Sequence, residues 1–238
     1  MELELRYQEI EKRFEECSDF SGKDLVRSRN LFNLENSQVV PKRFEVWTTL
    51  VGLPLPEGLT QNFQNITQQL IERLPANTRF YSVLPQNYHW EVFIIKRPDE
   101  EVDSKDLQKT PNMLEKILSN HPPFSLCYRG VLINTDGTII AKGYGDFDQL
   151  RAKLRQAIPF ASLQQSQLGH VSLGRILDPV GSQAFTQLKQ FVQNSQHEFY
   201  GELDVSQINY VHESQWYMEQ RDIVATVPFG SAVDKASC

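Results

Sequence analysis

The 238-residue sequence predicts an α+β fold, with helices on the outside of curved antiparallel sheets. Helical and strand-like patterns alternate along the chain without the regular strand–helix–strand repeat of a parallel α/β protein. The dipeptide Asp136-Gly137 separates two apolar runs, which is a strong signal for an antiparallel hairpin. The second half of the chain also echoes the order of the first. We therefore expect two pseudo-symmetric lobes, flanked by outer helices, around a central cleft.

The N-terminal segment predicts an amphipathic helix over residues 2–17. Four apolar side chains recur there at spacings of four and three residues: Leu3, Tyr7, Ile10 and Phe14. The polar stretch that follows, up to Pro41, is expected to be an irregular strap. We divide the chain into an N-terminal helical extension (1–41), a main domain (42–230) and a C-terminal tail (231–238).

The first half of the main domain has the patterns of three strands and two helices. We expect strands at 44–52, 79–84 and 87–95, and helices at 59–74 and 113–118. The charged stretch 96–112 has no hydrophobic period, so we interpret it as a surface loop.

The second half begins with the hairpin, whose strands we place at 124–134 and 139–145. Helices are expected at 147–158 and 182–193, and strands at 169–176, 198–210 and 216–227.

Composition limits the partners and the compartment. A net charge of −6 provides no basic field for duplex DNA, although a small phosphate site needs only a few local donors. The three cysteines form no CxxC pair, which is typical of reduced thiols in the cytoplasm. No run approaches the ~18 apolar residues of a membrane span, and the acidic N-terminus is unlike a secretory signal. We expect a cytoplasmic protein with no membrane partner.

Two of the five histidines lie in strands with matching surroundings, NYHWEVFII (87–95) and GHVSLGRI (169–176). Residues i and i+2 of a strand share a face, so His89 points with Glu91 and His170 with Ser172. The opposite faces are apolar and are expected to pack under helices. The two histidine faces are expected to look into one shared cleft.

These motifs resemble those of the 2H phosphoesterase superfamily, which includes 2′,5′ RNA ligase-like proteins and cyclic nucleotide phosphodiesterases. The run His170-Val171-Ser172-Leu173-Gly174-Arg175 is similar to the second motif of the ligase-like members. The run His89-Trp90-Glu91 resembles the first motif, with its hydroxyl residue replaced by glutamate. The resemblance covers residues 42–229.

The resemblance implies a metal-independent phosphoesterase with no cofactor. His89 and His170 would act as general base and general acid across one phosphate, each contributing ~10²–10⁴-fold. The hydroxyl groups at the i+2 positions of the family, here Ser172, would donate hydrogen bonds to the non-bridging phosphate oxygens. Expected substrates are 2′,3′-cyclic phosphates, other cyclic phosphates, 2′,5′-linked nucleotides or RNA ends. A non-catalytic module that binds a nucleotide or a phosphorylated metabolite is the alternative.

Glu91 departs from the family pattern. An ionised carboxylate ~4 Å from a phosphate oxygen is repelled by ~4 kcal/mol at an effective dielectric of about 20. A neutral hydrogen bond contributes only ~0.5–1.5 kcal/mol. Glu91 could be a protonated donor, pair with a cation and orient His89, or mark a site that has lost catalysis. A fourth reading is a metal site of His89, Glu91 and His170.

Four further residues are candidates for substrate binding. Arg175 could bind phosphate, although strand alternation places it on the face opposite His170 unless it reaches around the strand end. Tyr144, Tyr210 and Trp216 could stack on a nucleobase, which is worth ~1–3 kcal/mol per base.

Overall fold

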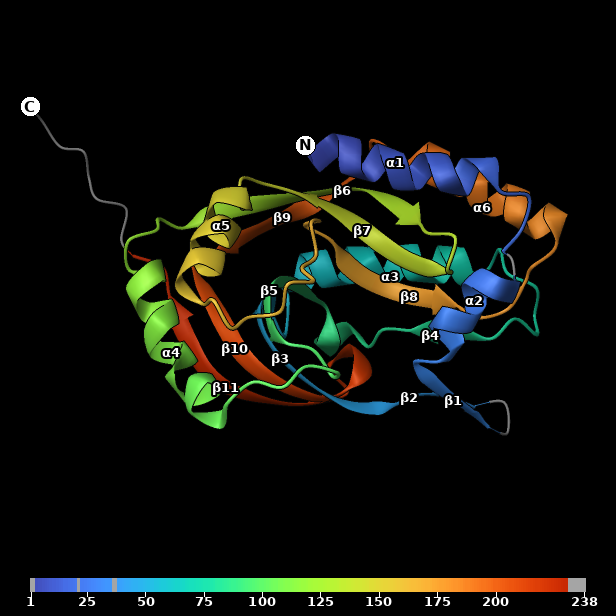
Figure 1. Ribbon diagram of the computed structural model, residues 1–238. Coiled ribbons are helices and arrows are strands. Elements are labelled where there is room, and N and C mark those ends of the chain that lie inside the picture. Colours follow the sequence, from blue (N-terminus) through green and yellow to red (C-terminus); the bar gives the residue numbers. More distant parts are fainter. Residues whose placement is uncertain (1–2, 21, 36–37, 231–238) are drawn as a thin grey trace, which may run out of the picture.

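The computed structural model describes residues 3–20, 22–35 and 38–230, and within these ranges the α+β prediction is confirmed (Figure 1). A nine-stranded sheet carries helices on its faces, and a separate two-stranded sheet is formed by the N-terminal segment. The predicted C-terminal tail (231–238) lies outside the described residues. No helix in the described part of the chain has the length and apolar character needed to cross a membrane.

The nine strands of the large sheet pair antiparallel throughout, in the order β11-β10-β3-β5-β8-β7-β6-β9, with β4 added beside β8. Their bounds are β3 Arg43–Gly52, β4 Phe80–Ser82, β5 His89–Lys96, β6 Phe124–Ile133, β7 Thr138–Tyr144, β8 Val171–Ile176, β9 Phe199–Val205, β10 Gln207–Gln215 and β11 Gln220–Pro228.

The sheet is almost divided in two at its middle. One residue pair, Trp90 with Val171, is all that joins β5 to β8, whereas the pairings on either side are extensive. The strands β11, β10, β3 and β5 thus make one lobe, and β8, β7, β6 and β9 make the other. This arrangement agrees with the two expected lobes.

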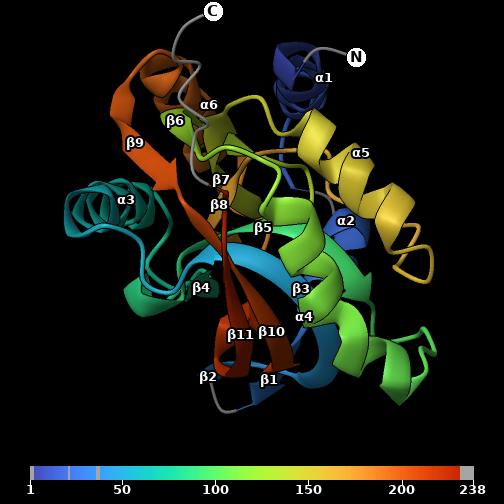
Figure 2. The ribbon, with the colours of Figure 1, turned by 90° about the vertical axis from the view of Figure 1, so that its left-hand side faces the viewer.

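Helices cover the sheet on several sides: α1 Leu3–Glu16, α2 Gly22–Arg29, α3 Glu57–Ile71, α4 Ser104–Leu118, α5 Asp148–Ala157 and α6 Ser182–Ser195. Figure 2 shows α3 on one side of the strands, with α4 and α5 on the other. Phe63 of α3 packs edge-on against Tyr88 and Tyr128. Trp90 is fully buried and packs against Phe147 at the start of α5. The apolar faces of the histidine strands therefore do pack under helices.

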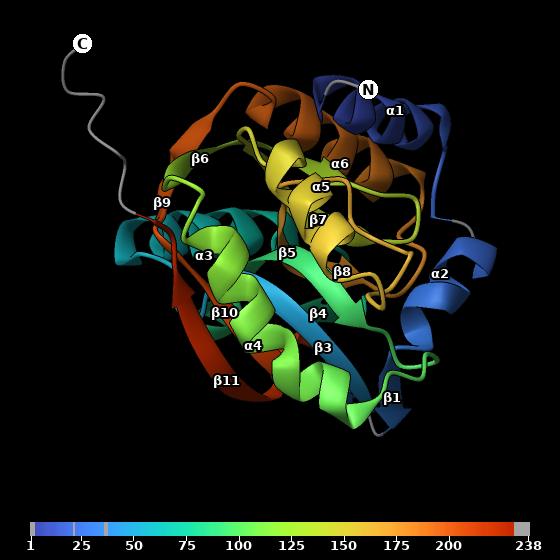
Figure 3. The same cartoon turned by 60° about the vertical axis from the view of Figure 1, so that its left-hand side comes forward.

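The prediction of a loop at 96–112 is wrong in its second half, because α4 begins at Ser104 and packs against β11 and α5 (Figure 3). Asp103 caps this helix by accepting a hydrogen bond from Lys105 N at 2.8 Å. Thr110, Leu114 and Leu118 form its buried stripe, at helical spacing. Charged residues fill its outer face and concealed the period in the sequence.

The N-terminal segment is more regular than the predicted strap. After α1 and α2 come two short paired strands, β1 Phe32–Glu35 and β2 Gln38–Pro41. Helix α1 lies beside α6 along one edge of the molecule (Figure 1), and its Tyr7 packs with Leu132 and Ile140. Ile140 is the cross-strand partner of Ser172, and such partners share a face. Helix α1 therefore covers the sheet face that carries Ser172.

The C-terminal strands also differ from the prediction. The expected strand at 198–210 is two strands, β9 and β10, separated at Ser206. A short 3₁₀ turn, Trp216–Met218, then connects β10 to β11. Tyr217 and Met218 both have positive φ angles in this turn, of 63° and 59°. Residues other than glycine rarely adopt such angles, and in this turn the Tyr217 ring packs against Phe32 and Tyr81.

Candidate active site

A cavity of about 160 Å³ opens beside the residue pair that joins the lobes. Its walls come from β5, β8, β10, the turn after β10, the segment after β4 and the N-terminal segment. They consist of Leu31, Val83, His89, Glu91, His170, Ser172, Arg175, Glu213, Trp216 and Tyr217. Six of the eight candidate residues chosen from the sequence therefore meet in one place.

The strand register explains how the histidines come together. Trp90 pairs with Val171 in antiparallel fashion. One further step in each direction sets His89 opposite Ser172 and Glu91 opposite His170. The two histidines then occupy a diagonal, for which the usual separation is ~7–8 Å. A single phosphate group can be contacted from both sides across such a gap.

His89 is oriented by its own chain. Its Nδ1 lies 2.7 Å from the carbonyl oxygen of Asn87, an oxygen that can only accept, so Nδ1 carries the proton. The other ring nitrogen, Nε2, then has a free lone pair. Burial lowers the pKa of His89, which keeps the ring neutral and able to accept a proton. The Asn87 side chain is itself fixed, because its Oδ1 accepts a hydrogen bond of 2.7 Å from Arg221.

His170 is positioned through the residue before it. The Gly169 N–H donates to the Tyr7 hydroxyl at 3.2 Å, and the Gly143 N–H donates to the same oxygen at 3.2 Å. A Cβ at Gly169 would lie 2.5 Å from the Gly143 carbonyl oxygen, so this approach requires glycine. Burial, with Arg151 and His89 nearby, lowers the pKa of His170 to about 4. Its Nδ1 is buried with no protein hydrogen-bond partner.

Two carboxyl groups share the cavity with the histidines. Burial raises the pKa of Glu91, whose Oε2 lies 3.4 Å from the Thr48 hydroxyl. Burial also raises the pKa of Glu213 to about 8, even though its Oε1 accepts a 2.8 Å hydrogen bond from Met218 N. With a pKa of about 8, Glu213 is mostly neutral near pH 7, and burial shifts the pKa of Glu91 in the same direction. A neutral carboxylic acid can donate a hydrogen bond, which an ionised carboxylate cannot.

Glu213 and Leu31 were not identified from the sequence. Glu213 lies on β10, far along the chain from either histidine motif, and only the sheet order brings it close. The one signal in the sequence was a glutamate two residues after buried Val211, on a strand that is otherwise mostly buried. Leu31 has no such signal, because it lies in the N-terminal segment outside the region of family resemblance.

Arg175 faces the cavity, contrary to the strand alternation. The pairing of β7 with β8 shifts between Ile139 and Ile140, which lie opposite Gly174 and Ser172. One extra residue of β8 is thus inserted, and such a bulge turns the following side chains to the other face. Arg175 donates to the Tyr217 hydroxyl at 2.7 Å and forms an ion pair with Asp136 at 3.3 Å.

Tyr144 and Tyr210 do not reach this cavity. Tyr210 is fully buried and its hydroxyl donates to the Leu107 carbonyl oxygen at 3.2 Å, so its role is in the core. Tyr144 lines a separate surface pocket. There the Cζ atom of Arg129 lies over its ring, 4.4 Å from the ring centroid. The prediction that these two rings bind substrate beside the histidines is therefore wrong.

The geometry gives no support to a metal site of His89, Glu91 and His170. In residues 3–20, 22–35 and 38–230, no group of three or more His, Cys, Asp or Glu side chains is arranged to hold a metal ion.

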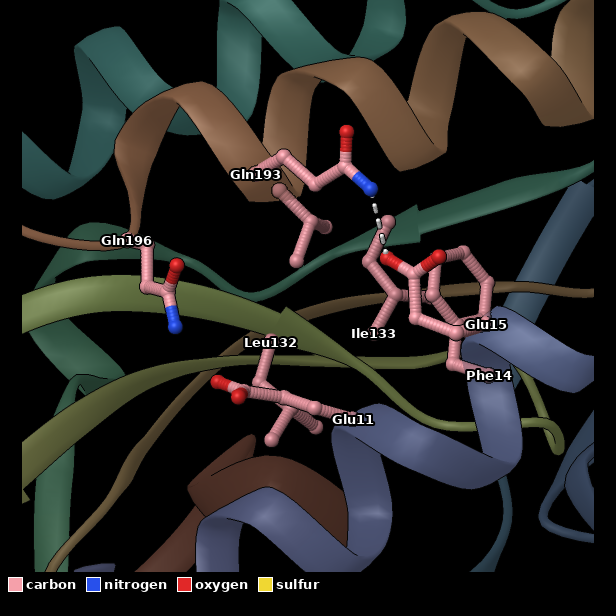
Figure 4. A pocket seen from close by; sticks show the side chains of 8 residues that line it. Glu11, Phe14, Glu15, Leu132, Ile133, Gln193 and Gln196 are labelled. Carbon is pink, nitrogen blue, oxygen red and sulfur yellow. Dashed lines mark hydrogen bonds between the residues drawn. The ribbon is translucent and has the colours of Figure 1, made fainter.

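A second cavity, of about 220 Å³, lies between α1 and α6 (Figure 4). Figure 4 shows Glu15 of α1 accepting a hydrogen bond from Gln193 of α6, with a distance of 3.1 Å. Glu11 pairs with the buried ammonium of Lys142 at 2.6 Å. These polar groups are thus used in joining the two helices to each other and to the sheet.

Neither a protein-family model nor a curated protein sequence matches the chain. Several solved structures, in contrast, do match the chain. TT0787 of Thermus thermophilus aligns with a TM-score of 0.57 and 14% identity over 78% of this chain and 98% of that one. LigT of Escherichia coli aligns with a TM-score of 0.53 and 13% identity over 80% of this chain and 100% of its own. A structure described as a phosphoesterase aligns with a TM-score of 0.53 and 13% identity over 79% of this chain and 99% of that one.

The chain therefore shares the fold of LigT, TT0787 and this phosphoesterase. These neighbours are covered almost end to end, whereas about a fifth of this chain has no counterpart in them.

Proposed function

We propose that this protein is a metal-independent phosphoesterase that opens a cyclic phosphate by acid–base chemistry between His89 and His170. The observation that carries the proposal is the diagonal placement of the two imidazoles, with Ser172 and Glu91 between them, on one cavity. Crystals of LigT, which has the same fold, contain phosphate in one case and 3′-AMP or NADP+ in others. They support phosphate esters and nucleotides as the class of ligand.

His89 is the general base in this reaction. Its Nε2 takes a proton from the attacking water while the water oxygen forms a bond to phosphorus. The hydrogen bond from Nδ1 to Asn87 supports this role, because it fixes the tautomer in which Nε2 has the free lone pair.

His170 is the general acid, which gives a proton to the leaving oxygen as its bond to phosphorus breaks. The ring must be charged to do so, and its pKa of about 4 in the empty cavity leaves it neutral at pH 7. An anionic phosphate beside the ring favours the charged form and raises that pKa. Binding of the substrate therefore favours the protonated His170 ring, which can act as the acid.

Glu91 and Ser172 hold the non-bridging oxygens of the phosphate. Ser172 donates through its hydroxyl, and Glu91 donates through its protonated carboxyl. The raised pKa of Glu91 supports this assignment, since the neutral acid avoids the ~4 kcal/mol repulsion expected for an ionised carboxylate at ~4 Å. The phosphate itself raises that pKa further.

The test is hydrolysis of a cyclic phosphate in the presence of EDTA by wild type, His89→Ala and His170→Ala. Each substitution is expected to lower kcat/KM by at least ~10²-fold, with the melting temperature preserved. His197→Ala is the matched control, because His197 is exposed and lies outside the cavity. Activity that survives either cavity substitution, or that EDTA removes, contradicts the mechanism.

A non-catalytic binding module is the second candidate, and the low pKa of both histidines favours it, because two neutral rings supply no acid. A phosphorylated ligand would then raise the melting temperature of the wild type with no turnover of any cyclic phosphate. Turnover that depends on both histidines excludes this candidate.

A further inference from the structure

The N-terminal segment closes one side of the histidine cavity. Leu31, which joins α2 to β1, lines the cavity itself. The next residue, Phe32, is 3% exposed and packs against the rings of Tyr81 and Tyr217, at centroid distances of 5.0 and 5.7 Å. Tyr217 lines the cavity too, so Phe32 supports the wall from behind.

This segment is attached to both lobes. On the β8 side, Ser28 accepts a 2.7 Å hydrogen bond from Arg175 and donates one to the carbonyl oxygen of Asp136. On the β10 side, the Trp216 N–H donates to Lys42 O at 3.2 Å, and the Gln215 side chain donates to Pro41 O at 2.7 Å. Such a bridge holds Leu31 in place over the cavity.

The cavity that remains is small. Its volume of about 160 Å³ is below the roughly 300–1,000 Å³ typical of sites that enclose a drug-sized ligand. A phosphate group with a few carbon atoms fits this space, whereas a nucleoside would have to extend out of it past the wall that Leu31 forms.

Each of the two aromatic rings at the cavity already has one face stacked on another ring of the protein. Trp216 stacks on Phe44 with a centroid distance of 3.8 Å. Tyr217 stacks on Phe32 and lies 4.6 Å from Tyr81. A nucleobase is normally bound by stacking on a free ring face. Here the protein's own rings occupy faces that a base would use.

We propose that Leu31 is a specificity-determining residue that restricts the site to cyclic phosphates of small, base-free diols. This inference rests on the proposed function and narrows its substrate class. Leu31 makes the wall, Ser28 and Phe32 fix the wall to the two lobes, and the acid–base machinery of His89 and His170 remains as described.

The test compares glycerol 1,2-cyclic phosphate with 2′,3′-cyclic AMP as substrates of the full chain. For wild type, kcat/KM is expected to be at least ~10-fold higher for the glycerol compound. Leu31→Ala is expected to reduce that ratio at least ~10-fold, through a gain on 2′,3′-cyclic AMP. Leu5→Ala, an identical change at an exposed position of α1, is expected to leave the ratio unchanged. A wild type that prefers the nucleotide, or a ratio that Leu31→Ala does not move, overturns the inference.

Failure of the proposed function gives a different result, since neither compound would be hydrolysed by any variant. In that case, calorimetric titration measures the affinities for glycerol 1-phosphate and for 3′-AMP, and their comparison tests whether Leu31 restricts the size of the ligand. Tighter binding of glycerol 1-phosphate to wild type, with 3′-AMP gaining affinity in Leu31→Ala, supports it. Tighter binding of 3′-AMP to wild type, or no binding of either compound, overturns it.

Discussion

The two strands that carry the histidines hold them in different ways. His170 follows Gly169, whose N–H is bound by Tyr7 from the distant helix α1, and its neighbour on the cavity is Ser172. His89 is held by the carbonyl oxygen of Asn87, two residues away, and its neighbour on the cavity is Glu91. We call His170 with Ser172 the β8 half-site and His89 with Glu91 the β5 half-site. The β8 half-site is held by a contact to a distant helix and provides a hydroxyl. The β5 half-site is held by a contact within its own segment and provides a carboxyl.

This difference shows that the same position on a strand can provide a hydrogen-bond donor in two ways, through a hydroxyl or through a carboxyl group. A serine hydroxyl donates a hydrogen bond at any ordinary pH. A glutamate donates only while it is protonated, and burial provides that condition by raising its pKa. The β5 half-site is therefore expected to depend on pH, and the β8 half-site to depend on the N-terminal helix.

Tyr7→Phe breaks the tertiary support of the β8 half-site. It leaves the N–H groups of Gly143 and Gly169 buried without their acceptor, and each such group costs ~1–3 kcal/mol. We expect the free energy of unfolding to fall by at least ~1 kcal/mol in urea titrations, and kcat to fall with it. The same change at half-buried Tyr144 is the control, and equal effects of the two substitutions would contradict the role of Tyr7.

Glu213→Gln tests the acid environment of the β5 half-site through stability. The folded pKa of Glu213, about 8, lies above its ordinary value. The stability from this group is therefore complete below about pH 4.5 and is lost as the pH rises through about 8. Glutamine cannot ionise and can still accept from Met218 N. The variant should exceed wild type by ~1 kcal/mol or more at pH 8, and by less at pH 5.

Melting curves from pH 4.5 to 8.5 give that comparison, with exposed Glu202→Gln as the control. A difference between Glu213→Gln and wild type that is constant across this range would mean that Glu213 is ionised in the folded protein.

Ser172→Ala has the smallest expected effect. It removes one neutral hydrogen bond to the phosphate, worth ~0.5–1.5 kcal/mol, so kcat/KM should fall about 2- to 10-fold with no change in pH optimum. Ser125→Ala, on the exposed Ser125, should leave the rate unchanged. A shift of the pH optimum in Ser172→Ala would show that the two half-sites do not act separately.

The histidine strands could be predicted because their signal is local. Alternation along the sequence placed Trp90 in the core and His89 with Glu91, and the structure agrees. The first part of helix α4 was missed, because its buried stripe includes the polar Thr110 and because Pro111, a poor helix former, interrupts the pattern.

The rest of the site depends on pairings that no local pattern reveals. Arg175 reaches the cavity through a bulge that is visible only in the register of β7 against β8. Glu213 and Leu31 come from opposite ends of the chain and meet the histidines through the sheet order and the N-terminal bridge. The raised pKa of Glu91 likewise follows from burial, which no local pattern in the sequence reveals.

The pH–rate profile of Glu91→Gln tests the central claim most directly. Glutamine is a neutral donor at every pH, so the variant should retain at least about a tenth of the wild-type kcat/KM. Its activity should also persist to higher pH, because the ionisation of Glu91 no longer removes the donor. The acid side of the profile, set by His89, should be unchanged. A folded Glu91→Gln protein that is inactive at every pH would contradict the account, because the ionised carboxylate would then be the working form.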